Sequence, residues 1–449
     1  MGKLFGTDGI RGRANEYPMT VEMALNIGKA TAHLFKREGH VPKIIVGKDT
    51  RLSGYMFENA IISGICSMGV NAISVGVIPT PGIAFLTSSM RADAGIVISA
   101  SHNPLQDNGI KIFSGDGFKL PDEKELAIEQ LILENNMKKL HPAPGDAGKM
   151  YRMDDAGGRY TVFLKHAFPK ELTLEGTRIV LDCANGATYK VAPETFFELG
   201  AEVITLFDRP DGKNINAHCG SQYPERLAEE VIKRRAGVGF AFDGDGDRLI
   251  AVDEKGKILT GDQILAICAD MIKKDGYLTN NLVVRTVMSN IGLSIAFRNL
   301  GIDSILTKVG DRYVIEEMLN KGAVIGGEDS GHLIFLQHHT TGDGIITALQ
   351  VLTAIKKSGK PLSELSDIMT VFPQALINID VKTTPDLSTV PEIVHIIQDT
   401  EKVLGNNGRV LVRYSGTQNM CRVMVEGPTH EETERYCRRI ADVVKKKIG

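Results

Sequence analysis

Three aspartates alternate with glycines in one short segment, Asp243-Gly244-Asp245-Gly246-Asp247-Arg248. The segment follows an apolar run over 238–242, so we expect it at the end of a buried strand. Carboxylates this close repel one another by roughly 4 kcal/mol per pair at 4 Å and an effective dielectric constant of 20. The pattern therefore predicts a site for a hard cation such as Mg²⁺ or Ca²⁺, which prefers oxygen ligands.

The same segment does not fit an EF-hand calcium loop. Such a loop needs glycine at its sixth position, and counting from Asp243 that position is Arg248. The flanking apolar runs also have the character of strands and not of helices. Mg²⁺ takes few protein carboxylates and completes its shell with phosphate oxygens and water, so we favour a magnesium site beside a phosphate.

A second polar turn, Ser99-Ala100-Ser101-His102-Asn103-Pro104, follows another apolar run, and Lys111 stands ten residues after Ser101. A serine here could act as a nucleophile, with His102 or Lys111 handling its proton. An ordinary turn is the alternative, because Asn and Pro form turns readily. No GxSxG elbow surrounds Ser101, which argues against a serine hydrolase.

Two more segments offer groups that bind hydroxyls and phosphates. In the run 326–332 (GGEDSGH), Glu328 and Ser330 could hydrogen-bond a sugar, although a tight β-turn is an alternative interpretation. The segment 413–419 (RYSGTQN), with Arg422 beyond it, combines two arginines with hydroxyls and suits a phosphate dianion; a plain surface turn is equally open. No GxxxxGK[ST] loop occurs in the chain.

Two glycine-containing runs are weaker signals. The first is 6–12 (GTDGIRG), which could be a mere turn. The second is 308–312 (KVGDR), where Asp311 could simply cap a helix that begins at Arg312. Taken together, all these segments describe a nucleophilic serine, a cation site, a hydroxyl-binding loop and a phosphate clamp, which is a set suited to moving a phosphoryl group on a phosphorylated sugar.

Short apolar runs alternate with longer amphipathic stretches through most of the chain, which predicts α/β layers with mostly parallel sheets. The rhythm occurs three times, and the tail after residue 370 follows a different order, typical of a smaller α+β domain. We expect domains at 1–150, 151–256, 257–370 and 371–449, with a proline-rich linker at 141–145. The predicted strands are 43–47, 72–77, 94–99, 178–182, 202–207, 238–242, 282–286, 303–307, 323–326, 375–381, 410–413 and 422–425, and the predicted helices are 21–38, 55–68, 191–199, 291–300, 312–320, 390–404 and 431–447.

Composition narrows the class of protein. The 449 residues include 52 Lys and Arg against 55 Asp and Glu, and this nearly neutral balance argues against a dedicated nucleic-acid binder. No run of 18 apolar residues is present, so we expect no membrane span. The six cysteines form no CxxC pair, which argues against a zinc site and a disulfide framework and favours a cytoplasmic protein with reduced, mostly buried thiols.

The motifs resemble those of the α-D-phosphohexomutase superfamily, in the same order and over essentially the whole chain. Within that superfamily they are most similar to the bacterial members that act on glucosamine phosphates, with members acting on mannose or glucose phosphates as the alternative. The motifs are residues 5–12 (FGTDGIRG), 98–104 (ISASHNP), 243–248 (DGDGDR), 307–314 (TKVGDRYV), 326–332 (GGEDSGH), 340–344 (TTGDG) and 413–417 (RYSGT).

The resemblance implies three similar mixed-sheet α/β domains and a smaller C-terminal α+β domain around a central cleft. It makes Ser101 the phosphorylated serine, which with Asp243, Asp245 and Asp247 holds Mg²⁺. It places Arg11, His102, Lys111 and Arg248 at the reacting centre, with Lys111 as an acid or base. The implied sugar and phosphate contacts are Lys308, Gly310, Glu328, Ser330, Arg413, Ser415, Gly416, Thr417 and Arg422.

The implied reaction interconverts glucosamine 6-phosphate and glucosamine 1-phosphate through a phosphoserine enzyme and a 1,6-bisphosphate, feeding UDP-N-acetylglucosamine synthesis. The implied partners are the sugar phosphate and its bisphosphate, with no nucleic acid and no membrane, in a monomer or homodimer. Two departures from the family pattern bear on the sugar and on the clamp. Asp329 stands where Gln or Met is common, and Gln418-Asn419 stand where Glu-Pro is common.

Overall fold

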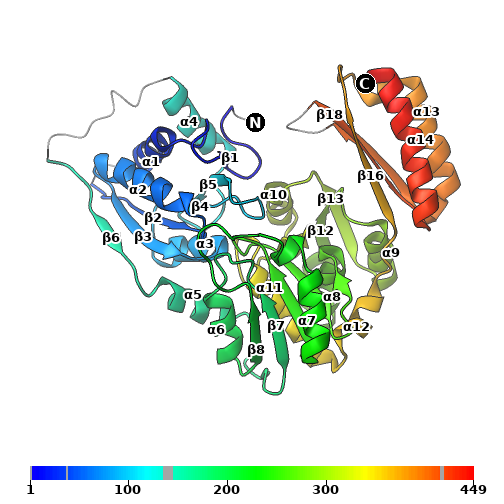
Figure 1. Ribbon diagram of the computed structural model, residues 1–449, viewed down its shortest axis with the longest axis horizontal. Coiled ribbons are helices and arrows are strands. Elements are labelled where there is room, and N and C mark those ends of the chain that lie inside the picture. The colour runs from blue at the N-terminus through cyan, green and yellow to red at the C-terminus, as the bar shows by residue number, and fades with distance from the viewer. Residues whose placement is uncertain (1–2, 37–38, 135–144, 415–418) are drawn as a thin grey trace. The chain divides into compact units, whose positions relative to one another are not determined.

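The computed structural model describes residues 3–36, 39–134, 145–414 and 419–449 (Figure 1). Packing divides the chain into two compact units, and each is described by itself. The first unit comprises Met1–Met288 and Asp303–Asp367; the second comprises Ser289–Ile302 and Ile368–Gly449. The linker expected at 141–145 lies, apart from Gly145, outside the described residues.

The first sheet of the first unit has six strands in the order β1-β5-β4-β2-β3-β6. Its inner strands are parallel, and β5 is antiparallel to both of its neighbours, β4 and β1. Three helices share one apolar core with this sheet, in which Ile27, Phe57 and Ile128 are completely buried. The strands are β1 (Ile10–Arg13), β2 (Lys43–Lys48), β3 (Asn71–Val77), β4 (Ala94–Ile98), β5 (Asp107–Ser114) and β6 (Met150–Arg152), and the helices are α1 (Val21–Phe35), α2 (Ser53–Ser67) and α4 (Asp122–Leu133). A further helix, α3 (Thr80–Ser89), packs on β2 and β4.

The second sheet has the order β11-β10-β9-β7-β8. The strands β7, β8 and β9 are parallel, and β10 and β11 are added antiparallel at one edge. The strands are β7 (Arg178–Asp182), β8 (Glu202–Leu206), β9 (Val238–Phe242), β10 (Leu249–Asp253) and β11 (Ile258–Leu259), and the accompanying helices are α5 (Ala156–Lys165), α6 (Val191–Glu198) and α7 (Glu225–Arg234).

The third sheet has the order β13-β12-β14-β15, with only β15 antiparallel. The helix before it, α8, begins with a capping box in which Thr260 and Gln263 bond each other's backbone N–H groups. The elements are α8 (Gly261–Lys274), β12 (Leu282–Thr286), β13 (Asp303–Thr307), α10 (Asp311–Lys321), β14 (Ile325–Gly327), β15 (Leu333–Phe335), α11 (Gly344–Ser358) and α12 (Leu362–Leu365). All three sheets are thus mixed, because each carries antiparallel strands at one edge of a parallel set.

The second unit is a three-stranded antiparallel sheet, in the order β16-β18-β17, with two helices packed on it (Figure 1). Val423, Cys437 and Ile440 are completely buried between the sheet and the last helix. Helix α9 (Ile291–Leu300) also belongs to this unit, since its Ile291 N–H donates to the buried carboxylate of Glu426 at 2.8 Å. The other elements are β16 (Gln374–Asp380), α13 (Pro391–Leu404), β17 (Arg409–Tyr414), β18 (Met420–Glu426) and α14 (His430–Ile448).

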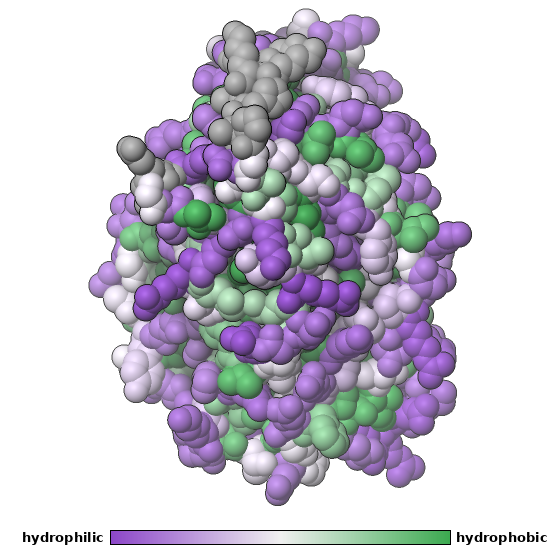
Figure 2. Space-filling view, turned by 90° about the vertical axis from the view of Figure 1, so that its left-hand side faces the viewer, coloured by the Kyte–Doolittle hydropathy of each residue, from purple (hydrophilic) through white to green (hydrophobic). Residues whose placement is uncertain are grey.

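The surface is mixed in character and most of the thiols are buried. On the face shown in Figure 2, hydrophobic side chains lie in small groups among hydrophilic ones. Within the described ranges, no helix is both long and apolar enough to cross a membrane. All six cysteines are free, and all but Cys66 are buried.

Candidate active site

Three equivalent hairpin loops, one from each sheet of the first unit, carry most of its predicted site residues. The others are Arg11 on β1, Lys111 on β5, and Lys308 and Gly310 between β13 and α10. Ser101 lies between β4 and β5, the aspartate segment between β9 and β10, and Glu328 between β14 and β15. Each loop leaves the carboxyl end of a parallel strand and returns along an antiparallel neighbour. The carboxyl ends of parallel strands are where α/β folds place ligands.

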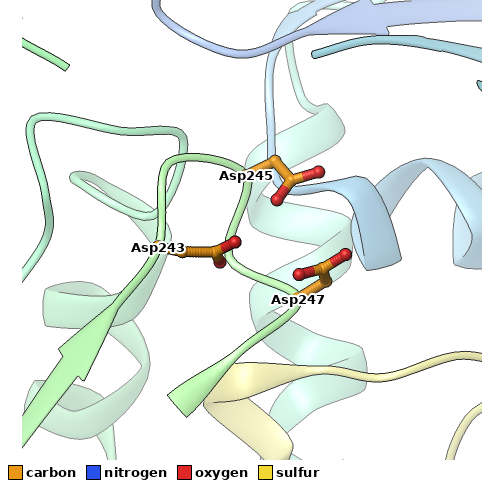
Figure 3. Close-up of side chains that lie close together, drawn as sticks. All are labelled: Asp243, Asp245 and Asp247. Carbon is orange, nitrogen blue, oxygen red and sulfur yellow. The ribbon is translucent and has the colours of Figure 1, made fainter. Parts of the chain in front are cut away.

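The aspartate loop brings three buried carboxylates together (Figure 3). One oxygen from each of Asp243, Asp245 and Asp247 lies within 4.8 Å of the others. The hydroxyl of Ser101 donates to Asp243 Oδ2 at 2.5 Å, so the predicted nucleophile adjoins this cluster. A Cβ atom at Gly244 would lie only 2.6 Å from the Ser101 carbonyl oxygen, and glycine therefore permits the two loops to approach.

The oxygen atoms that remain in the cluster fit a cation. Asp245 Oδ1 and Asp247 Oδ1 are buried and accept no hydrogen bond from any described residue. Burial of a carboxylate oxygen that accepts no hydrogen bond is costly, and a bound cation would be a partner for both atoms. Asp247 Oδ1 also lies 3.8 Å from Arg248 Nε, an ion pair at a distance too long for a hydrogen bond. A set of carboxylate and hydroxyl oxygens is the ligand type that Mg²⁺ prefers, so the residues present fit the predicted ion.

The charges around the cluster shift its ionisation. Burial, and then the neighbouring carboxylates of Asp247 and Asp245, raise the pKa of Asp243 well above its usual value. Burial alone would lower the pKa of Lys111, but the carboxylates of Asp245 and Asp8 outweigh it and hold that pKa well above its usual value. Lys111 Nζ lies 3.0 Å from Asp245 and 3.1 Å from Asp8, so it is a fixed cation beside the aspartates.

The serine loop is held in a strained conformation by a buried arginine. Ser101 has a φ of +53°, in the left-handed region that non-glycine residues seldom adopt. The guanidinium of Arg51, which is fully buried, donates to the carbonyl oxygens of Ser101 at 3.0 Å, Asn103 at 2.8 Å and Pro104 at 2.6 Å. The side-chain amide of Asn216 donates to two of the same carbonyls, at 2.8 and 3.0 Å. These five bonds fix the direction of the Ser101 side chain.

His102 and two arginines complete the surroundings of the serine. His102 Nδ1 lies 3.1 Å from the hydroxyl of Ser101. Burial, followed by the positive charges of Arg248 and Arg11, lowers the pKa of His102 to about 4, which keeps the imidazole neutral at neutral pH. Arg248 Nε lies 3.8 Å from Asp247, and Arg11 pairs with Asp8.

The loop between β14 and β15, which carries Glu328 and Ser330 and is called the sugar loop below, is linked to the start of α10. The N–H of Gly310 donates to Glu328 Oε1 at 2.9 Å, which joins the two predicted sugar-contact segments. Lys308 Nζ lies over the ring of Tyr313 at 5.8 Å, and the hydroxyl of Ser330 is buried and has no hydrogen-bond partner among the described residues. A buried hydroxyl without a partner is the kind of group that a ligand would satisfy.

Asp311 and Asp329 each accept a backbone N–H in the first turn of a helix. Helix α10 begins at Asp311 itself, one residue earlier than predicted, and Asp311 Oδ1 accepts the N–H of Arg312 at 2.8 Å, as the capping interpretation expects. The other oxygen of the Asp311 carboxylate, Oδ2, pairs with Lys119. Asp329, the departure in the sugar loop, turns toward the first turn of α8, where its Oδ1 accepts the N–H of Asp262 at 3.4 Å. A carboxylate at a helix N-terminus is favourable, which gives Asp329 a structural role.

The predicted phosphate clamp belongs to the second unit. Arg413 of β17 stands directly opposite Arg422 of β18 in the antiparallel register, so both side chains lie on one face. Burial, and then the charge of Arg422, lower the pKa of Arg413, and the buried Arg422 Nε lacks a hydrogen-bond partner within the described part of the chain. Two like charges held together favour an anion between them. Ser415, Gly416 and Thr417 lie outside the described residues.

Several residues of the site had no strong signal in the sequence. Asp8 lies in the glycine-rich run 6–12, which is a weak signal, and His332 is the last residue of the run 326–332. Thr80, whose hydroxyl donates to Asp245 Oδ2 at 2.6 Å, and Arg51 and Asn216, which hold the serine loop, carried no local pattern. Their positions depend on contacts between segments far apart in the chain.

Comparison with known proteins gives matches over almost the whole length. Four family models match: phosphoglucomutase/phosphomannomutase alpha/beta/alpha domain I at residues 2–139, domain II at 159–256, domain III at 260–372 and the C-terminal domain at 376–443. A protein of Syntrophus aciditrophicus named phosphoglucosamine mutase is 76% identical over 449 residues, covering 100% of both chains. Another of that name from Syntrophobacter fumaroxidans is 61% identical, again over 100% of both chains.

Solved structures share the fold at lower identity. A phosphoglucomutase/phosphomannomutase family protein from Burkholderia thailandensis is 23% identical and superposes with a TM-score of 0.81, covering 99% of this chain and 98% of that one. The Aspergillus fumigatus N-acetylphosphoglucosamine mutase, solved in complex with GlcNAc-6P and magnesium, is 17% identical with a TM-score of 0.66, covering 99% of this chain and 95% of that one. The matched models and the relatives together establish that the chain belongs to the phosphoglucomutase/phosphomannomutase family and is a phosphohexomutase.

Proposed function

We propose that this enzyme interconverts glucosamine 6-phosphate and glucosamine 1-phosphate, and that Ser101 carries the phosphoryl group between turnovers. The observation that carries the proposal is the position of the Ser101 hydroxyl, 2.5 Å from Asp243 Oδ2 at the edge of a carboxylate cluster in which two oxygens accept no hydrogen bond from the described residues. Relatives 76% and 61% identical bear the name phosphoglucosamine mutase and support the choice of sugar. The product would feed UDP-N-acetylglucosamine synthesis in the cytoplasm.

The reaction consists of two phosphoryl transfers. In the first, the P–Oγ bond of phosphoserine 101 breaks and a P–O bond forms to the C1 hydroxyl of glucosamine 6-phosphate; this hydroxyl loses a proton and the leaving Ser101 Oγ gains one. The resulting 1,6-bisphosphate turns end for end. In the second, the bond between the 6-phosphoryl group and the sugar O6 breaks as Ser101 Oγ takes that group; Ser101 Oγ loses its proton and O6 gains one, which leaves glucosamine 1-phosphate. Atoms and charge balance over the cycle, and the enzyme is again phosphorylated.

The chain's own residues supply charge and position for these transfers. Phosphoryl transfer depends mainly on in-line placement and on neutralisation of the spread negative charge. Lys111, Arg11 and Arg248 are cations beside the aspartate cluster, and the neutral His102 lies next to the nucleophile. Asp243, Asp245, Asp247 and the phosphoserine would hold Mg²⁺, which when bound would neutralise phosphoryl oxygens. The magnesium named with a related mutase structure supports this metal.

The remaining residues fit recognition of the sugar and of the second phosphate. Glu328 and Ser330 would bond sugar hydroxyls, with Lys308 and Gly310 in the adjoining loop. Arg413 and Arg422 would bind the phosphate that is not reacting, with Ser415, Gly416 and Thr417 between them in sequence. A related mutase solved with glucose 1,6-bisphosphate supports a site that accepts a doubly phosphorylated sugar.

The test has two parts. Intact-protein mass spectrometry with peptide mapping should find one phosphate, on Ser101, and Ser101→Ala should lose that phosphate and nearly all turnover while keeping its thermal melting temperature. Rates on glucosamine, glucose and mannose 6-phosphates should then favour glucosamine. Wild-type turnover in Ser101→Ala would refute the nucleophile, and a large preference for glucose or mannose would instead place the enzyme with the phosphoglucomutases or phosphomannomutases.

A further inference from the structure

Lys119 lies between two carboxylates that come from different parts of the first unit. Its ammonium group forms ion pairs with Asp8, in the N-terminal loop, and with Asp311, the first residue of α10. The three side chains are only 12%, 24% and 12% exposed, so water screens these pairs weakly. Neither Lys119 nor Asp311 was a predicted member of the site.

On one side, the contacts lead from Lys119 to the reacting centre. Asp8 uses its second oxygen, Oδ2, for Lys111 Nζ at 3.1 Å, and the same oxygen pairs with Arg11. Lys111 in turn contacts Asp245 of the aspartate cluster at 3.0 Å. Asp8 therefore orients two cations of the centre and is itself held by Lys119.

On the other side, the contacts lead to the sugar loop. Asp311 Oδ2, the oxygen that Lys119 holds, lies 3.6 Å from His332 Nε2, and His332 Nδ1 lies 3.7 Å from Asp247. The residue before Asp311 is Gly310, whose N–H donates to Glu328. Asp311 and its neighbour Gly310 thus contact both ends of the loop that would contact the sugar.

We propose that Lys119 is a positioning residue that holds the sugar loop at the correct position relative to the phosphoryl-transfer centre. The inference rests on the proposed function only in assigning sugar contact to Glu328 and phosphoryl transfer to Ser101. The physical reason is that Asp8 and Asp311 share one ammonium group. Without it, two buried carboxylates would repel each other, and the two segments that they anchor would separate.

A plain structural link between α4 and α10 is the competing explanation, and the chain offers a matched control for it. Arg312, the neighbour of Asp311 on α10, pairs with Asp122 and with Glu125 of α4, the latter at 2.7 Å. Its side chain is 17% exposed, similar to that of Lys119. Arg312→Met therefore removes a similarly buried cation that joins α4 to α10, and it leaves Lys119 in place as the partner of Asp8 and Asp311.

The experiment compares Lys119→Met with Arg312→Met in the full-length enzyme. For each variant we would measure kcat, KM, the melting temperature and the phosphate content of Ser101. Loss of the bisphosphate intermediate from the enzyme would be measured separately, as the dependence of turnover on added glucose 1,6-bisphosphate. We expect kcat/KM of Lys119→Met to be lower than that of Arg312→Met by about tenfold or more, which equals about 1.4 kcal/mol of transition-state stabilisation. We also expect the turnover of Lys119→Met to depend more strongly on added bisphosphate than that of Arg312→Met. Its melting temperature should fall no further than that of Arg312→Met. Equal losses in the two variants, or an unchanged Lys119→Met, would overturn the proposal.

A double-mutant cycle tests the same point if Lys119→Met is poorly folded. In Lys119→Met/Asp311→Asn the repelling carboxylate is gone, so this variant should recover part of the loss of kcat/KM and of melting temperature. If the loss of kcat/KM in the double variant equals the product of the losses in the two single variants, the two carboxylates do not repel each other and the proposal is wrong. The assays use whichever hexose 6-phosphate the wild-type enzyme turns over best, so a wrong choice of sugar would be seen in the wild type and is separate from any failure of Lys119.

Discussion

The hydroxyl of Ser101 and the carboxylate of Asp243 lie 2.5 Å apart, although 142 positions separate them in the chain. Each stands at the carboxyl end of an inner parallel strand, β4 and β9, in two different sheets. The contact joins the predicted nucleophile to the predicted metal ligands. It also brings the loop between β4 and β5 and the loop between β9 and β10 together at one site.

Metal removal should reduce both activity and stability. A chelator should abolish turnover, and added Mg²⁺ should restore it. Mg²⁺ should also raise the melting temperature, because a ligand at a free concentration of 100 times its Kd stabilises the native state by about 2.7 kcal/mol. Asp245→Asn and Asp247→Asn should lose most of this gain, measured by calorimetry with and without Mg²⁺. Asp253→Asn is the matched control, since Asp253 is a buried aspartate of the same hairpin that caps backbone N–H groups of Lys255 and Lys257. A Mg²⁺ response unchanged in Asp245→Asn would remove Asp245 from the metal site.

Arg51→Lys should disturb the serine loop. Lysine cannot reproduce a planar fork that reaches three carbonyl groups, and loss of charged hydrogen bonds costs about 1.5–3 kcal/mol. We expect a loss of unfolding free energy of that order and a kcat lowered by about tenfold or more, measured by urea unfolding and steady-state kinetics. Arg13→Lys, at an arginine whose side chain is 64% exposed, should change neither quantity. Normal kcat in Arg51→Lys would show that the loop keeps its conformation without the fork.

His339 should make stability depend on pH. It is buried, with Nε2 bonded to the carbonyl of Pro81 at 2.9 Å and Nδ1 accepting the N–H of Thr340 at 2.8 Å, which requires the neutral ring. Burial lowers the pKa of His339 to about 4, against about 6.5 in the unfolded chain. Because the folded-state pKa is the lower one, the unfolded state binds more protons as pH falls. The contribution is complete above pH 6.5 and is lost between about pH 6.5 and 4, with a total of about 3 kcal/mol.

The measurement for His339 is urea unfolding from pH 4.5 to 8 in the wild type and in His339→Gln. The difference in unfolding free energy between the two proteins should shrink as the pH falls, because Gln cannot titrate. A difference that is constant over this range would mean that His339 titrates normally in the folded protein.

Arg413→Ala should weaken binding of the sugar phosphate. A charged hydrogen bond contributes about 1.5–3 kcal/mol, so Kd should rise by roughly ten- to a hundredfold, measured by isothermal titration calorimetry. Arg438→Ala removes the same charge from a 72% exposed site of the same unit and should leave Kd unchanged. Equal Kd values for Arg413→Ala and the wild type would exclude Arg413 from the clamp.

Local sequence patterns predicted much of the fold. Strands β7 and β9 match the predicted ranges in full, and the boundaries of α1 and β2 differ from prediction by at most three residues. These elements are strongly apolar or strongly periodic, and their conformation depends on neighbours a few residues away. The hairpin partner β5 was missed because it lies among turn-forming residues, and only pairing with β4 makes it a strand.

The sequence by itself determined which chemistry is available: a serine after one apolar run, three aspartates after another, and arginine pairs near the C-terminus. The tertiary structure decided which of these meet, by bringing Ser101 onto Asp243 and by placing Lys119 between Asp8 and Asp311. The physical reason is the distance along the chain over which each kind of interaction acts. Periodicity and turn formation act over a few residues, whereas ion pairs between buried groups of distant segments exist only after the sheets have packed and excluded water.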